Sequence, residues 1–532
     1  MKRSILYSTI FAFAVTASGC TDDFTELNTD PKNLTVDNLG QSEYGGIVRA
    51  AMYSPVFFPQ SARGPFQLTQ SLFADVYANY FATTAPNFES DQFVLVGGWL
   101  NGAFNYFYGT AAPQIKYAED YAAENDFALE NAMMKVWRVW SYHQVTDYWG
   151  PIPYSEFGNR ENSVAYDSQE EIYRDFFTTL DEAIPVLQSN AGKTSFLGSN
   201  DLLYGGNVDQ WIRFANSLKL RLAMRVRYAD EDLSKAEAEE AVAAGVLESN
   251  DDNAIIETNA DYANRYNTIT QWGEFRMSAD MESILKGYLD PRVANYVAPA
   301  AIPDPTDDPA GVAFPYEGMR NGQTKVVKQG TKFNDIASDM AAPYKENGVP
   351  GPDWIVMNAA ESFFLRAEGA LAGYNMGGGT AQSFYEQGIV TSHEQYGYDG
   401  TNLRGANYVT SANTPASFNG VVPAPSNVPV AYDAAGSAER QLEQIITQKW
   451  IALYPDSREA WAEKRRTGYP TFYSRINSLN AKISEEELPR RVTYVDAEFT
   501  NNAEAVQDAI DNKLGGPDDG TTRLWWDKKP GN

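Results

Sequence analysis

The 532-residue chain contains one cysteine, Cys20, and two histidines, and these shortages exclude several classes of site. One thiol cannot build an intrachain disulfide framework, and one cysteine with two histidines cannot supply a Cys/His zinc site. His143 and His393 each fall in a helical pattern with no catalytic motif around it, so we expect each to be a packed or helix-capping residue and not a catalytic base. We therefore expect no metal and no cofactor.

Positive charge is also scarce, because 42 lysines and arginines stand against 70 aspartates and glutamates and leave a formal charge of −28. A field this acidic repels phosphate backbones, so we expect no nucleic-acid partner. Beyond the first residues, the sequence has no apolar run of the roughly 20 residues that a membrane-spanning helix needs. Hydrophobic residues make up 43% of the chain, which is typical of a folded globular protein.

Residues 1–19 have the features of an export signal: a positive start, a mostly apolar stretch over residues 5–15, and small residues before Cys20. This order resembles a bacterial lipobox, in which the cysteine is lipidated and becomes the first mature residue. We predict a signal peptide over 1–19, lipidation of Cys20 and a polar tether over 20–40. The alternative is a short buried helix that ends in an ordinary thiol. Acyl chains would anchor the protein on a membrane without crossing it.

Apolar residues recur at helical spacing wherever the pattern is strong. Met133, Trp137 and Trp140 follow an i, i+4, i+7 pattern, and Trp450 lies on a similar stripe, so we assign these tryptophans to the core. Ser168 stands before two glutamates, which predicts the N-cap of a helix.

The pattern predicts a mainly α fold with minor β, in a single ligand-binding domain over residues 41–532. The helical scaffold is expected over about 115–250 and 353–475. Within it, the helices around 355–395 resemble a tetratricopeptide hairpin, although no strict repeat period exists. Strand-like alternation is short, for example over 325–327.

Aromatic, Asn-rich stretches over 61–110 and 259–335 lack a helical pattern, and long loops of this kind usually carry function. Flat aromatic rings cover the apolar face of a sugar, while amide and guanidinium groups bind its hydroxyls. The same groups suit an extended peptide, and any single aromatic residue can simply be part of the core. The predicted ligand-binding residues are Trp272, Phe275 and Arg276, with Asn264 and Tyr266 nearby and Tyr80 and Trp99 as second choices.

A glycoside hydrolase is the alternative from another class, because carboxylates are abundant and glycosidases use a pair of them. No sequence feature singles out such a pair, and the chain has no G-x-S-x-G nucleophile motif. We therefore expect a binding protein without enzymatic activity.

Several segments, taken in order, resemble the SusD/RagB family of outer-membrane lipoproteins. Besides the lipobox, they are Phe24–Pro31, Trp140–Tyr154, Trp211–Arg225, Asp290–Arg292, Ile446–Gly468, Leu488–Tyr494 and Gly515–Trp526. The resemblance implies a scaffold of tetratricopeptide-like helices with irregular loops that carry the ligand site. It also implies a lipid-anchored lid that faces the cell exterior and delivers a glycan, or in some members an oligopeptide, to a SusC-like TonB-dependent transporter. It implies no catalytic residues.

Overall fold

The computed structural model describes residues 40–57, 62–161, 163–345 and 350–532. The chain divides into two units, residues 1–44 and 45–532, and nearly all described residues belong to the second unit. The predicted signal peptide, the lipidated Cys20 and most of the tether lie outside the described residues. Within the described ranges, no helix is both long and apolar enough to cross a membrane.

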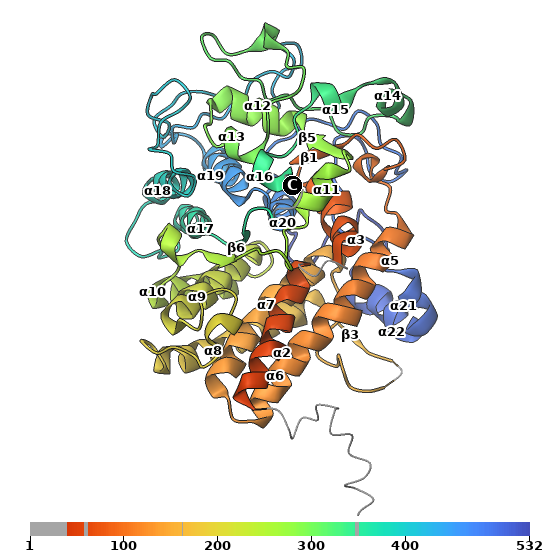
Figure 1. Cartoon of the computed structure of the whole chain (residues 1–532), viewed down its shortest axis with the longest axis vertical. Coiled ribbons are helices and arrows are strands. Elements are labelled where there is room, and N and C mark those ends of the chain that lie inside the picture. Colours follow the sequence, from red (N-terminus) through yellow and green to blue (C-terminus); the bar gives the residue numbers. More distant parts are fainter. Residues whose placement is uncertain (1–39, 58–61, 162, 346–349) are drawn as a thin grey trace, which may run out of the picture. The chain divides into compact units, whose positions relative to one another are not determined.

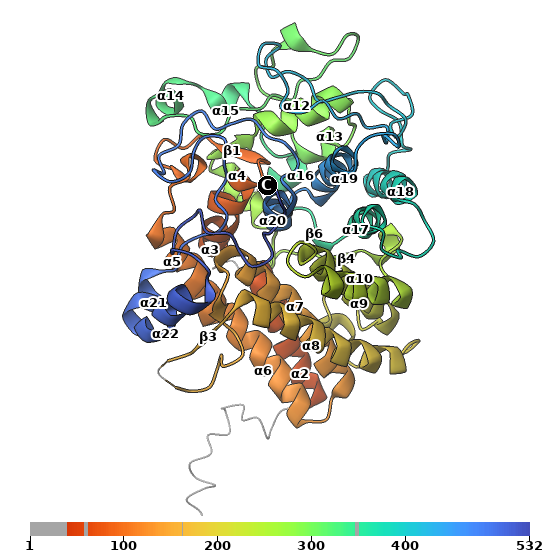
Figure 2. The ribbon, with the colours of Figure 1, turned by 180° about the vertical axis from the view of Figure 1, so that it is seen from behind.

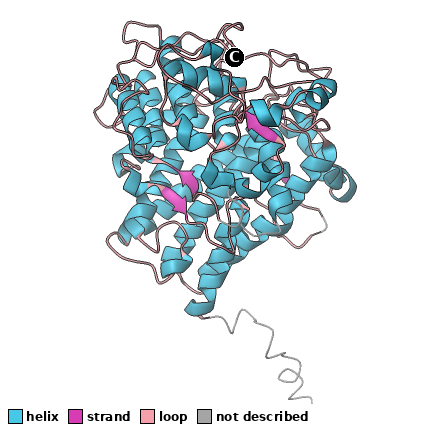
Figure 3. Ribbon diagram, turned by 45° about the horizontal axis from the view of Figure 1, so that its top comes forward, coloured by secondary structure: helices cyan, strands magenta, loops and turns pink. Residues whose placement is uncertain are grey.

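Helices make up most of the described structure, which confirms the predicted mainly α fold (Figures 1 and 3). The longer helices are α2 (Gln41–Tyr53), α5 (Gly97–Tyr106), α6 (Ala112–Glu124), α7 (Ala128–Trp149), α8 (Gln169–Ser189), α9 (Val208–Arg225), α10 (Glu231–Ala244), α12 (Ala279–Tyr288), α17 (Ala359–Leu371), α18 (Ala381–Glu394), α19 (Ala438–Leu453) and α20 (Ser457–Thr467). The shorter helices are α3 (Arg63–Phe66), α4 (Asp75–Tyr77), α11 (Tyr266–Gln271), α13 (Val293–Tyr296), α14 (Lys325–Gly330), α15 (Phe333–Ile336), α16 (Ala342–Lys345), α21 (Asp496–Asn501) and α22 (Ala503–Asp508).

The strands of the described residues form three small antiparallel pairs. They are β1 (Phe81–Thr83) with β5 (Phe275–Met277), β2 (Ile152–Pro153) with β3 (Tyr166–Asp167), and β4 (Ala254–Ile256) with β6 (Trp354–Met357). The β1–β5 pair matters most for the site, because it joins the two loop regions that the sequence singled out. Phe81 lies opposite Met277, and Thr83 lies opposite Phe275.

Neighbouring helices pack as hairpins, with α7 against α8, α9 against α10, and α17 against α18 (Figure 2). The last pair confirms the tetratricopeptide-like hairpin expected around 355–395. Gly388 of α18 allows this close packing, because a Cβ at that position would lie 2.9 Å from the Phe364 ring of α17. Ser168 caps α8 through a reciprocal capping box with Glu171, as its sequence position predicted.

One local prediction is wrong: residues 325–327 do not form a strand but begin helix α14. The Thr324 hydroxyl accepts a hydrogen bond from the Val327 amide and so caps the first turn. The predicted core tryptophans are confirmed, since Trp137, Trp140 and Trp450 are at most 2% exposed.

A buried ion network links α9, α17, α19 and α20. Its cations are Arg221, Arg225, Lys449 and Arg466, and its carboxylates are Glu361, Glu368, Glu459 and Glu463. Arg466 binds Glu368 through two hydrogen bonds of 2.7 and 2.6 Å and also reaches Glu463 at 2.6 Å. Paired, hydrogen-bonded charges are the form in which ions are tolerated in a protein interior, and here they join helices that are far apart in sequence.

Candidate functional site

The β1–β5 pair brings two of the predicted residues, Trp99 and Phe275, into one aromatic row. Phe88 lies between them: its ring centroid is 5.4 Å from that of Trp99 and 6.1 Å from that of Phe275. Thr84 joins the segment after β1 to the segment before β5. Its amide donates to the Glu274 carbonyl at 2.9 Å, and its hydroxyl donates to the Gly273 carbonyl at 2.7 Å. Phe275 itself is 7% exposed, so it supports the row from beneath.

Trp272 is the predicted residue that is most available to a ligand. It follows the last residue of α11, and 44% of its surface is exposed. The next residue, Gly273, has a φ of +68°, and a Cβ there would lie 3.1 Å from Asn334 Nδ2. This turn therefore requires glycine and places the Trp272 backbone beside helix α15.

Arg276 lies on the same strand as Phe275 but is 7% exposed. Its Nη1 donates to the Phe275 carbonyl at 2.7 Å and lies 3.5 Å from Asp339 Oδ2, while its Nε has no partner among the described residues. Burial lowers the pKa of this guanidinium, and Asp339 offsets only part of that effect. Arg276 is therefore a supporting cation just behind the surface.

Three further predicted residues are even more deeply buried than Phe275 and Arg276, and we exclude them from direct ligand contact. Tyr80 is fully buried and donates to the Trp450 carbonyl at 2.5 Å. Tyr266 is 2% exposed and donates to Asp75 Oδ1 at 2.8 Å. Asn264 is 2% exposed, and its Oδ1 accepts from the Tyr266 amide at 3.1 Å. All three hold the loop region to the scaffold, because their polar groups are used by protein partners.

A cavity of about 490 Å³ lies next to this region, and we call it the loop-face cavity. Its walls come from the loop after α13, from α15 and from the loop before α19. The lining residues are Ile302, Pro303, Asp304, Pro305, Glu317, Gly318, Met319, Arg320, Gln323, Phe333, Ile336, Phe418 and Asn419. α15 contributes Phe333 and Ile336 to the cavity and lies next to Gly273, whereas Trp272 itself is not among the lining residues.

The loop-face cavity combines apolar walls with three charged residues, Asp304, Glu317 and Arg320, none of which forms an ion pair within the described ranges. Glu317 is 6% exposed and accepts the Asp304 amide at 3.0 Å, and burial, followed by repulsion from Glu282, raises its pKa to about 7. Arg320 donates to the Ser474 carbonyl at 2.6 Å and lies over the Tyr473 ring. Apolar walls with a few polar groups are the usual composition of a small-molecule site.

The cavity overlaps one of the two predicted loop regions but contains none of the predicted ligand-binding residues. Most of the lining belongs to the predicted loop region 259–335, yet no predicted site residue lines it. The apolar walls instead use Ile302, Ile336 and Phe333, which are aliphatic or single aromatic residues without a local motif. Ile302 and Ile336 are 61% and 41% exposed, a property that only the folded structure displays.

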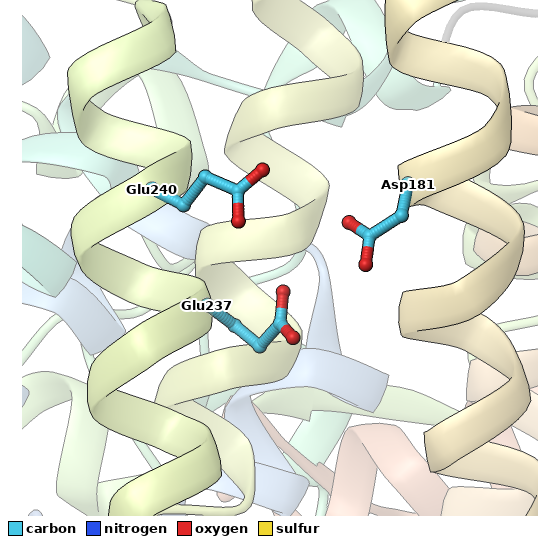
Figure 4. Close-up of side chains that lie close together, drawn as sticks. All are labelled: Asp181, Glu237 and Glu240. Carbon is cyan, nitrogen blue, oxygen red and sulfur yellow. The ribbon is translucent and has the colours of Figure 1, made fainter.

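One cluster of three carboxylates among the described residues is close enough together to hold a metal ion. It consists of Asp181, Glu237 and Glu240 and is here called the acidic trio (Figure 4). The Lys219 ammonium already lies among these carboxylates, at 2.6 Å from Asp181, 2.8 Å from Glu237 and 3.3 Å from Glu240. A resident cation neutralises the trio, so we interpret it as a link between α8, α9 and α10.

Both histidines are buried, at 1% for His143 and 0% for His393. Burial is the main cause that lowers their pKa values, to about 3 and about 4 respectively. Each is neutral near pH 7 and distant from solvent, as the sequence predicted for packed histidines.

Comparison with known proteins gives a consistent result. The SusD-like family model, described as SusD and RagB outer membrane lipoprotein, matches residues 26–527. A chitin-binding SusD homologue from Flavobacterium johnsoniae is 37% identical, with a TM-score of 0.80, and the match covers 91% of this chain and 98% of that one. A SusD homologue from Bacteroides vulgatus is 32% identical, with a TM-score of 0.82 and coverage of 92% and 99%. The comparison with curated proteins gives no match.

The family match spans nearly the whole chain, and the solved homologues share its helical scaffold over almost their full length. The resemblance read from the sequence segments is thereby confirmed. The chain belongs to the SusD-like family of nutrient-binding outer-membrane lipoproteins.

Proposed function

We propose that this protein is a surface lipoprotein that captures an oligosaccharide at the loop face and delivers it to a SusC-like TonB-dependent transporter. The observation that carries the proposal is a cavity of about 490 Å³ on the loop face, lined by apolar side chains and a few charged groups, in the same loop region as the exposed Trp272. The family is one of nutrient-binding outer-membrane lipoproteins, and one homologue is described as chitin-binding.

The chemistry of the loop face suits a sugar chain. A sugar ring presents an apolar C–H face to Trp272 or to the Phe333 and Ile336 side chains, and such contacts need little loss of side-chain entropy. Its hydroxyls find acceptors and donors at Glu317 and Arg320, which form no ion pair within the described structure. Because these groups are already held by the backbone, they are positioned before the ligand arrives.

Calorimetric titration of the purified full-length protein tests the ligand class. N-acetylglucosamine oligomers, α-glucan oligomers and mixed oligopeptides are titrated separately, and the products are examined for shortened chains after long incubation. We expect saturable binding of at least one oligosaccharide and no chain cleavage. Binding of peptides alone would favour the peptide-delivering lid, and progressive chain shortening would favour the glycoside hydrolase.

The anchor and the partner need a second experiment in the native membrane. We expect Cys20 to incorporate labelled palmitate and the protein to co-purify with a large β-barrel after mild detergent extraction, because tethering raises the effective concentration of the lid near its transporter. The Cys20→Ala variant should incorporate no label and lose membrane association. A wild-type protein recovered unlabelled and without a barrel would contradict this part of the proposal.

A further inference from the structure

A small cavity, of about 30 Å³, is lined by residues of α5, α7 and the first turn of α20, and it shares no residue with the loop-face cavity. We call it the Arg458 cavity. Its lining is mostly apolar and aromatic and consists of Pro55, Phe57, Thr69, Ala103, Tyr106, Phe107, Ala111, Ser141, Gln144, Val145, Tyr148, Trp149 and Arg458. Of these lining residues, only Arg458 is charged. The volume is enough for about one or two bodies of the size of a water molecule.

Arg458 is a buried cation without a polar partner. It is 9% exposed, yet no hydrogen bond or ion pair joins its guanidinium group to another described residue. Its Nε is completely enclosed, whereas the terminal nitrogens Nη1 and Nη2 keep exposed surface. The guanidinium group lies 5.9 Å from the centroid of the Phe57 ring. Buried charges are normally paired and hydrogen-bonded, so this one lacks the partner that its burial requires.

Two carboxylates near Arg458 are engaged by other groups. Asp75 Oδ1 accepts a hydrogen bond from the Tyr266 hydroxyl at 2.8 Å, and Asp456 Oδ1 accepts one from the Glu459 amide at 3.3 Å. Neither forms an ion pair with Arg458 in the described part of the chain. Burial lowers the pKa of Arg458, and attraction to Asp456 offsets only part of that effect. The positive charge is therefore only partly compensated.

The backbone around the cavity also favours a bound anion. Two π-helical segments, Gln67–Ala74 and Phe107–Ala111, meet there, and such turns are rare and frequent at functional sites. Arg458 is the second residue of α20, where the helix dipole adds positive potential. The Thr69 hydroxyl, in the first of the π segments, has no partner among the described residues and can donate a proton.

We propose that the Arg458 cavity binds a small monovalent anion, namely chloride, at the terminal nitrogens of Arg458. The volume excludes sulfate, phosphate and sugar acids, which are several times larger than water. Guanidinium is more weakly hydrated than an ammonium group, so it suits a weakly hydrated anion between apolar walls. The bound anion supplies the missing partner of a buried charge and so stabilises the packing of α20 near α7. This role is independent of the sugar site.

Bromide tests the location directly, because it has the charge and nearly the size of chloride and is identified by its anomalous scattering. Crystals of the full-length protein are soaked in sodium bromide. We expect an anomalous peak beside the guanidinium group of Arg458. Absence of a peak at this position would overturn the proposal. Because this experiment uses the wild-type protein, it decides the proposal whether or not a variant folds.

Thermal melting tests the contribution of the anion. Sodium chloride replaces sodium gluconate at constant ionic strength, since gluconate is too large for the cavity. With chloride about tenfold above its Kd, the Tm of wild type should rise by about 1–2 °C relative to that of Arg458→Met, which shares every general salt effect.

Arg174→Met is the matched control, because Arg174 is half-exposed and pairs with Glu170 and Asp230 far from this lining. It should respond to chloride as wild type does, and so should Trp272→Ala, which separates this site from the loop face. An equal chloride response in wild type and in Arg458→Met would overturn the proposal.

Discussion

Replacement of Glu368 by glutamine tests whether the buried ion network holds the helical scaffold together. Glu368 is fully buried and receives two hydrogen bonds from Arg466 and one of 3.1 Å from Arg227. Burial raises the pKa of Glu368, but attraction to Arg466 and Arg227 outweighs it and leaves the pKa below its ordinary value. Removing one member of a buried ion pair costs about 3–5 kcal/mol. Because Arg466 keeps its ion pair with Glu463, we expect Glu368→Gln to lower the free energy of unfolding by about 3 kcal/mol, the low end of this range.

Urea unfolding followed by circular dichroism measures this loss. With an m-value of about 3 kcal/mol per M, the midpoint should fall by about 1 M in Glu368→Gln. Asp120→Asn is the matched control: Asp120 pairs with Lys116 at 2.9 Å, both side chains are more than 40% exposed, and the change should cost no more than about 0.5 kcal/mol. Equal midpoints for the two variants would refute the reasoning.

The pH dependence of the same variant gives an independent check. Since the pKa of Glu368 is lower in the folded state, its contribution is complete above the ordinary glutamate pKa of 4.5 and is lost as the pH falls below it. The difference between wild type and Glu368→Gln should therefore shrink in acid. A stability difference between wild type and Glu368→Gln that stays constant from pH 7 to pH 3 would show that the charge of Glu368 does not cause the destabilisation.

Three further predictions follow from buried groups. Burial lowers the pKa of His143 to about 3, so its imidazole NMR signals should not shift between pH 8 and pH 5, and His143→Gln should reduce the loss of stability on acidification below the ordinary histidine pKa of 6.5. Gly388→Ala should destabilise the protein by about 1–3 kcal/mol in urea unfolding because the new methyl group meets Phe364, whereas Gly64→Ala, which meets no atom within 4 Å, should be nearly neutral. Lys219→Met should make thermal stability respond to millimolar Ca²⁺, because the acidic trio then lacks its cation, while the melting temperature of wild type stays unchanged.

The scaffold could be predicted from sequence because its signals are local. The helix over 438–453 follows from apolar spacing, and the start of α8 follows from Ser168 and its two glutamates. The strand expected over 325–327 was wrong because three alternating residues carry less information than the Thr324 cap that begins α14. The N-cap hydrogen bond of Thr324 therefore favours a helix over a strand in this segment.

The exposure of the predicted ligand-binding residues could not be predicted from sequence, because burial depends on contacts between distant segments. Tyr80 bonds to a carbonyl 370 residues later, and Tyr266 bonds to Asp75, which precedes it by 191 residues. Aromatic composition could not separate these tyrosines from Trp272, which remains exposed. The fold brings Phe333 and Ile336 together with residues 302–305 and 418–419 in the cavity wall, so no sequence spacing could indicate it.

Hydroxyl-radical footprinting of the full-length protein, with and without a bound oligosaccharide, tests the location of the sugar site most directly. We predict that the ligand protects Trp272, Phe333 and Ile336 from oxidation and leaves Phe499, which is 41% exposed and lies on α21, unprotected. Protection of Phe499 with no change at Trp272, Phe333 or Ile336 would contradict a sugar site at the loop face.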